Sequence, residues 1–95
     1  MIRLVKQDFR AWLLKNRKVL VGRPEDFKHC PFCNFLKSKG AKKVSIHISH
    51  RIVDGKAHVH SQWQKDFQIN AIKQQRSLDV IGLRGSEALQ VLDEL

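Results

Sequence analysis

The sequence has 95 residues, of which 42% are hydrophobic, enough for one small domain with a modest core. No run approaches the roughly 18 apolar residues of a membrane span, and the N-terminal segment lacks the apolar stretch of a secretory signal. The two cysteines, Cys30 and Cys33, do not make the disulfide framework of a secreted protein. We therefore expect a single domain over residues 1–95 that is cytoplasmic, with reduced thiols and no membrane partner.

The charge is unevenly distributed along the chain. The formal net charge is +9, and residues 1–43 carry all of it, with 12 Lys and Arg against three acids. Residues 44–95 are balanced, with six basic and six acidic residues. This asymmetry favours an anionic partner, with nucleic acid first and an acidic protein surface second.

The first helix is predicted to begin at Asp8. Phe9, Trp12 and Leu13 recur at helical spacing and form one apolar stripe. The neighbouring face is basic, through Lys6, Arg10 and Arg17. A helix docked on a core and a helix lying against phosphates both show this pattern.

Residues 18–22 form a short apolar run that we expect to be extended, and Pro24 favours a turn over residues 23–26. A second helix is predicted from Pro31, because a proline at the first helical position loses no hydrogen bond there. Gly40 is expected to follow its last turn.

Residues 44–48 alternate between apolar and polar side chains, as a half-buried strand does. Asp54-Gly55 is a preferred hairpin turn, and residues 56–61 are predicted to return from it. This register sets Arg51 opposite His58 and Ser49 opposite His60. The predicted core face comprises Val44, Ile46, Ile48, Ile52, Ala57 and Val59. The predicted solvent face comprises His47, Ser49, Arg51, His58 and His60.

A further helix is expected over residues 62–75, then an extended segment over 78–83. Ser86 is a favourable N-cap for a final helix. The order of elements predicts an α+β fold, a hairpin or small antiparallel sheet with helices packed on its apolar face.

Cys30-Pro31-Phe32-Cys33 matches half of many zinc sites, because the spacing sets two thiolates on one side of a tight loop. The other ligands would come from the histidines at 47, 50, 58 and 60. The alternative is that both cysteines act as small buried apolar residues.

The same motif resembles the Cys-Pro-Phe-Cys of glutaredoxins, over residues 30–48. That resemblance implies a thiolate activated at a helix N-terminus. The cis-proline loop and the later Gly-Gly of glutaredoxins have no counterpart in this sequence.

Four residues of the predicted solvent face form a candidate anion or metal site: His47, Arg51, His58 and His60. Arg51 suits an anion such as phosphate better than a cation. The alternative is a simply solvated sheet face. Since the sequence has no nucleophile–base signature, Gly-rich phosphate loop or carboxylate pair, we expect no enzyme activity and no cofactor.

Ten basic residues are predicted to contact the partner: Arg3, Lys6, Arg10, Lys15, Arg17, Lys18, Lys37, Lys39, Lys42 and Lys43. Such contacts to phosphate supply affinity without sequence preference. Trp12 and the phenylalanines are expected in the core. The predicted function is a non-catalytic basic binding module; the alternatives are an accessory or inhibitor protein of mobile-element origin and a small zinc or thiol protein.

Three short patterns run through most of the chain: Asp8-Phe9-Arg10-x-Trp12-Leu13, then Val21-Gly22, then Cys30-Pro31 with Phe35-Leu36. With Trp63 to Phe67 and Ala88 to Leu92, they are similar to a loose group of small bacterial and phage proteins without assigned activity. The resemblance implies a shared fold and no activity.

Overall fold

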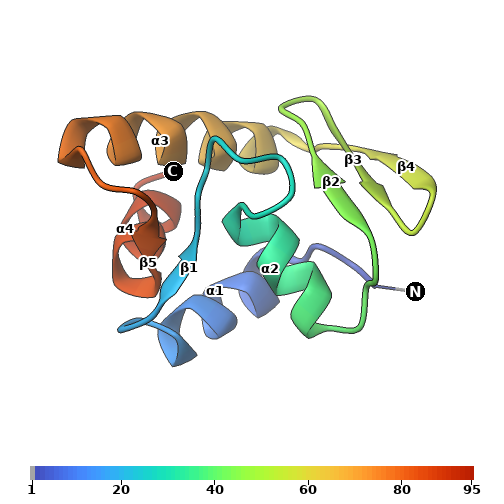
Figure 1. Ribbon diagram of the computed structural model, residues 1–95, viewed down its shortest axis with the longest axis horizontal. Helices are drawn as coiled ribbons and strands as arrows, with labels where there is room; N and C mark the ends of the chain where they lie inside the picture. The colour runs from blue at the N-terminus through green and yellow to red at the C-terminus, as the bar shows by residue number, and fades with distance from the viewer. Residues whose placement is uncertain (1) are drawn as a thin grey trace.

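The computed structural model describes residues 2–95, which form four helices and two small antiparallel sheets (Figure 1). The helices are α1 (Lys6–Lys15), α2 (Pro31–Ser38), α3 (Gln62–Leu78) and α4 (Gly85–Asp93). One sheet pairs β1 (Leu20–Gly22) with β5 (Leu83–Arg84). The other has the order β2 (Val44–Ile46), β3 (His50–Val53) and β4 (Lys56–Val59). The predicted α+β class is confirmed.

The helix ends follow local capping chemistry. Pro31 begins α2 as predicted, and Gly40 follows that helix with a φ of 109°. The Ser61 N–H donates a hydrogen bond to Gln64 Oε1 at 2.8 Å, which caps the N-terminus of α3. The prediction of Ser86 as N-cap is wrong, because α4 begins at Gly85 and Arg84 holds the N-cap position.

The register of the predicted hairpin is confirmed, with Val53 opposite Lys56 and Arg51 opposite His58. However, residues 44–53 are not one strand. The chain reverses a second time over residues 47–49, where the His47 N–H donates to the His50 carbonyl at 2.8 Å. The sheet therefore has three strands rather than two.

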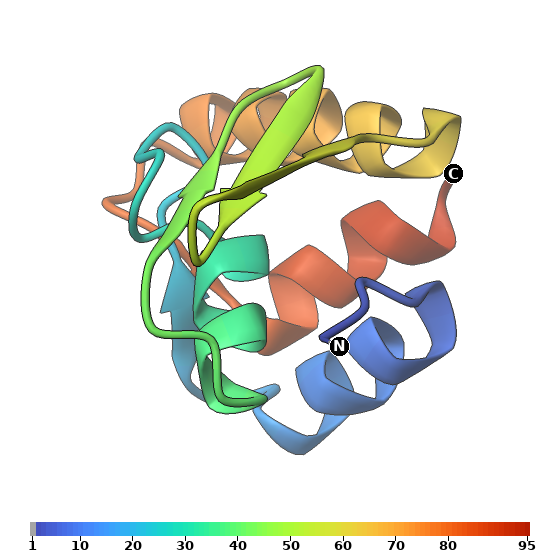
Figure 2. The same ribbon diagram turned by 90° about the vertical axis from the view of Figure 1, so that its right-hand side faces the viewer.

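This second turn inverts the predicted faces of β3 and β4. Val44, Ile46 and Val53 are buried in the core between the sheet and the helices. Figure 2 shows the three-stranded sheet lying over α2. Ile52 and Val59, predicted in the core, are 37% and 81% exposed. Ile48 and Ala57, predicted with them, are exposed too. Side chains along a strand alternate between the two faces of the sheet. The extra turn over residues 47–49 shifts this alternation, so the other set of side chains in β3 and β4 points inward.

One hydrophobic core joins the helices to the three-stranded sheet. Phe9 lies at its centre, with ring centroids 4.9 Å from Phe32, 5.4 Å from Phe35 and 5.1 Å from Phe67. These edge-to-face contacts connect α1 to both α2 and α3. Within residues 2–95, no helix has the length and apolar character needed to cross a bilayer.

The N-terminus of α4 lies against the C-terminal end of α1. The Gly85 N–H donates to the Val19 carbonyl at 3.0 Å, and the Ser86 N–H donates to the Arg17 carbonyl at 3.0 Å. A Cβ at position 85 would overlap the carbonyl oxygens of Asn16 and Leu13. Only glycine fits this crossing without moving a helix.

We therefore predict that Gly85→Ala lowers the free energy of unfolding by about 1–3 kcal/mol, because the added methyl meets rigid backbone. Urea denaturation followed by circular dichroism measures this change. The control is Ser86→Ala, since Ser86 is exposed, with an expected change of about 0.5 kcal/mol or less. An unchanged midpoint for Gly85→Ala would contradict the prediction.

Candidate functional site

Four lysine side chains line one groove on the surface. They are Lys28, Lys37, Lys42 and Lys43, and the groove has a volume of about 540 Å³. The remaining lining residues are Val44, Ser45, Ile52 and Gly55. The groove thus lies where the end of α2 meets the three-stranded sheet, and we call it the lysine groove.

Main-chain contacts fix the loops that carry these lysines. Asp54 Oδ1 accepts the N–H of Lys42 at 3.0 Å and the N–H of Lys43 at 2.8 Å. In return the Asp54 N–H donates to the Lys43 carbonyl at 2.8 Å. On the other side, Lys37 Nζ donates to the Lys28 carbonyl at 3.3 Å. The backbone is therefore held while the ammonium groups of Lys42 and Lys43 remain exposed.

The lysine groove is electropositive because its lysines are not neutralised by carboxylates. The three ion pairs found among residues 2–95 use Arg10, His29 and Arg76 as cations. The Asp54 carboxylate, at the edge of the groove, is already engaged by two N–H groups. Four lysine charges against the single carboxylate of Asp54 leave the groove with a net positive charge, which raises the local concentration of anions.

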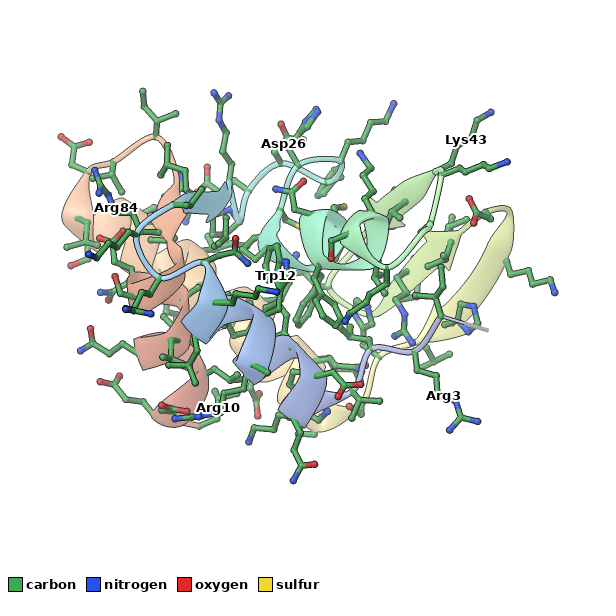
Figure 3. The ribbon with its side chains drawn as sticks, turned by 90° about the horizontal axis from the view of Figure 1, so that it is seen from below. Arg3, Arg10, Trp12, Asp26, Lys43 and Arg84 are labelled. Atoms are coloured by element: carbon green, nitrogen blue, oxygen red, sulfur yellow. The ribbon has the colours of Figure 1, made fainter. Side chains whose placement is uncertain are left out.

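The structure separates the other predicted basic residues from this groove. Lys15 and Lys39 line a second groove between α1 and α2, beside Trp12. Arg10 donates two hydrogen bonds to Asp93, at 2.9 and 3.1 Å, on the edge of the molecule opposite Lys43 (Figure 3). Arg17 Nη1 donates to the carbonyl of Leu14.

Arg3, Lys6 and Lys18 are exposed, and Figure 3 shows the Arg3 side chain pointing away from the molecule. Of the ten predicted residues, the groove contains Lys37, Lys42 and Lys43. Lys28 was missed by the sequence analysis. It is isolated in the sequence, and only the loop that precedes α2 brings it to the other three.

Of the candidate face, Arg51, His58 and His60 do not lie on the solvent side as predicted, whereas His47 lies on the outer side against Ser45 and Phe27. Arg51 Nη1 reaches Gln64 Oε1 at 3.4 Å, and burial lowers the pKa of its guanidinium. His60 is only 3% exposed. His58 is half-buried on the same inner side. The inversion of the strand faces is the reason for this error.

His60 is held in its neutral form. Its Nδ1–H donates to the Ile48 carbonyl at 3.0 Å, and its Nε2 is buried without a partner among the described residues. Burial lowers the pKa of His60, and the nearby Arg51 lowers it further. His60 is therefore part of the packing between the sheet and Phe32, whose ring lies 6.1 Å away.

The cysteines are buried at the start of α2. The Cys33 thiol donates to the Phe27 carbonyl at 3.0 Å, and Cys30 Sγ accepts the Cys33 N–H at 3.5 Å. Burial raises the pKa of Cys30. Within residues 2–95, no three His, Cys, Asp or Glu side chains gather as a metal site. Cys33 instead ties the loop that carries Phe27 and Lys28 to α2.

Comparisons of the chain with protein families, with characterised proteins and with solved structures find no significant match.

The burial of His60 gives a testable pH dependence. The unfolded chain binds a proton at this residue below about pH 6.5, whereas the folded chain, whose His60 pKa is lower, does not. Stability is therefore lost as the pH falls below about 6.5 toward the lower pKa of the folded state. Urea denaturation at each pH should show a steeper loss for the native sequence than for His60→Gln, which cannot titrate. Equal pH slopes would contradict this account.

Proposed function

We propose that this protein binds nucleic acid through the lysine groove. The observation that carries the proposal is the meeting of four unpaired lysines, from three segments of the chain, on one concave surface. Lysine is a compact point charge that suits phosphate, and a groove lined by lysines can follow a phosphate backbone.

The groove favours phosphate contacts over reading of base edges. Apart from lysines, which can contact either phosphate or guanine, its side chains are small or apolar, and it lacks the Arg fork and the Asn or Gln amides that read guanine and adenine. Contacts of this kind release counterions and give affinity that depends strongly on salt. We therefore expect binding with little sequence preference.

A catalytic role is not favoured. Ser45 Oγ lies 3.0 Å from His47 Nε2 beside the groove, which is the spacing of a nucleophile and a base. A carboxylate that would orient the His47 ring is not among the hydrogen-bond partners found in residues 2–95. Binding without chemistry fits the groove better.

An acidic protein surface is the second candidate, because exposed apolar side chains lie next to the charge. Ile52 lines the groove, and Val59 is 81% exposed on the same outer face of the sheet. A protein interface typically combines such an apolar patch with a polar rim. The two candidate partners are distinguished by whether the protein binds oligonucleotides and by how strongly that binding weakens with salt.

The test replaces Lys42 and Lys43 by glutamine. Fluorescence anisotropy with labelled oligonucleotides, at about 50 and 200 mM salt, should show weaker binding by Lys42→Gln/Lys43→Gln. The slope of log affinity against log salt should fall by about one for each lysine removed, because each releases its counterion on binding phosphate. Thermal unfolding would verify that the variant keeps the fold.

The matched control is Lys65→Gln/Lys73→Gln, which removes the same charge from α3. Its affinity and salt slope should stay close to those of the native sequence. Equal losses in both double variants would mean that net charge alone is responsible and would overturn the assignment of the groove. No binding to any oligonucleotide at low salt would favour the acidic protein partner instead.

A further inference from the structure

A row of three ring side chains lies beside the lysine groove. The ring of Phe27 has its centroid 5.1 Å from that of His47, and the His47 ring stacks on His50 at 4.6 Å with planes 17° apart. Phe27 is 57% exposed, whereas the other four phenylalanines are fully buried. We call these three residues the ring row.

The ring row is held in place by its backbone. The Phe27 carbonyl accepts the Ile46 N–H at 2.9 Å and the Cys33 thiol at 3.0 Å. His47 is fixed by its bond to Ser45 and by its N–H, which donates to the His50 carbonyl. A large apolar ring thus stays exposed on a rigid support, so little freedom is lost when a ligand covers it.

The ring row and the lysine groove form one continuous surface. Lys28 follows Phe27 in the same loop, and Ser45 both lines the groove and contacts His47. Lys43 and His47 are separated by β2, about 13 Å at roughly 3.3 Å per residue.

From this arrangement we infer that the ligand of the lysine groove is a single-stranded nucleic acid with a base that stacks on the exposed ring of Phe27, which His47 and His50 support from behind. This inference rests on the proposed function and specifies its substrate class. Phosphates would lie among the lysines while an unpaired base turns toward Phe27. In a duplex the faces of the bases are covered by their neighbours, so the ring row selects against it. Stacking accepts any base, because every base has a π-face.

The test compares three ligands of about 12 units, within the usual site size of a single-strand binder. They are a thymidine single strand, a duplex, and an abasic strand that keeps the phosphates and lacks the bases. The native protein should bind the thymidine strand about tenfold more tightly than the abasic strand or the duplex. Phe27→Ala should remove that advantage and leave binding to the abasic strand unchanged.

Two further variants make the result specific to the ring. Phe27→Trp, which restores an aromatic face, should recover the preference for the thymidine strand. Leu14→Ala, which shortens an exposed apolar side chain on α1, should have no effect. Because the Phe27 side chain is exposed, Phe27→Ala should unfold at nearly the native temperature.

The outcomes separate this inference from the proposed function. If Lys42→Gln/Lys43→Gln weakens binding of all three ligands while Phe27→Ala changes the affinity for none, phosphate binding by the lysine groove is supported and the stacking role of Phe27 is wrong. Equal affinity of the native protein for duplex and single strand would also overturn the inference. If no ligand binds at low salt, both proposals fail, and a protein partner for the outer sheet face becomes the better explanation.

Discussion

The packing of aromatic rings around Phe9 is the interaction on which the rest of the structure depends. The Phe9 ring contacts Phe32 and Phe35 of α2 and Phe67 of α3, so it joins three helices that are far apart in the sequence. Buried aromatic pairs contribute about 0.5–1.5 kcal/mol each beyond their burial. In a chain this small, such contacts are a large share of the net stability. They also orient α2, which carries Lys37 and lies between the two loops that carry the other lysines of the groove.

The core positions the surface through a few polar contacts at the two ends of α2. At its N-terminus, the Cys33 thiol holds the carbonyl of Phe27 and thereby the loop that bears Lys28. At its C-terminus, the chain passes Gly40 and is fixed at Lys42 and Lys43 by the carboxylate of Asp54. Cys33, predicted as a candidate metal ligand, and Asp54, predicted as a turn residue, thus both act as supports for the candidate interface.

Sequence patterns predicted the elements that are determined by residues within or next to them. Pro31 and Gly40 bracket α2, and Asp54-Gly55 sets the register of β3 and β4, because these residues restrict the backbone directly. The reversal over residues 47–49 has no such residue: His47-Ile48-Ser49 reads as a continued strand. Missing that turn placed Arg51 and His60 on the wrong face. Likewise, the exposure of Phe27 follows from the path of a loop, which composition cannot reveal.

Contacts between the acids of residues 44–95 and the basic half of the chain explain why the lysine groove is a better candidate interface than the rest of the basic surface. Residues 44–95 carry no net charge, yet their acids are placed unevenly: Asp93 neutralises Arg10 on α1. Asp54, by contrast, directs one oxygen at main-chain N–H groups and leaves the ammonium groups of Lys42 and Lys43 free of ion pairs. The positions of the few carboxylates therefore decide which part of the basic surface keeps its positive charge. The density of lysine in the sequence alone would have favoured α1 equally.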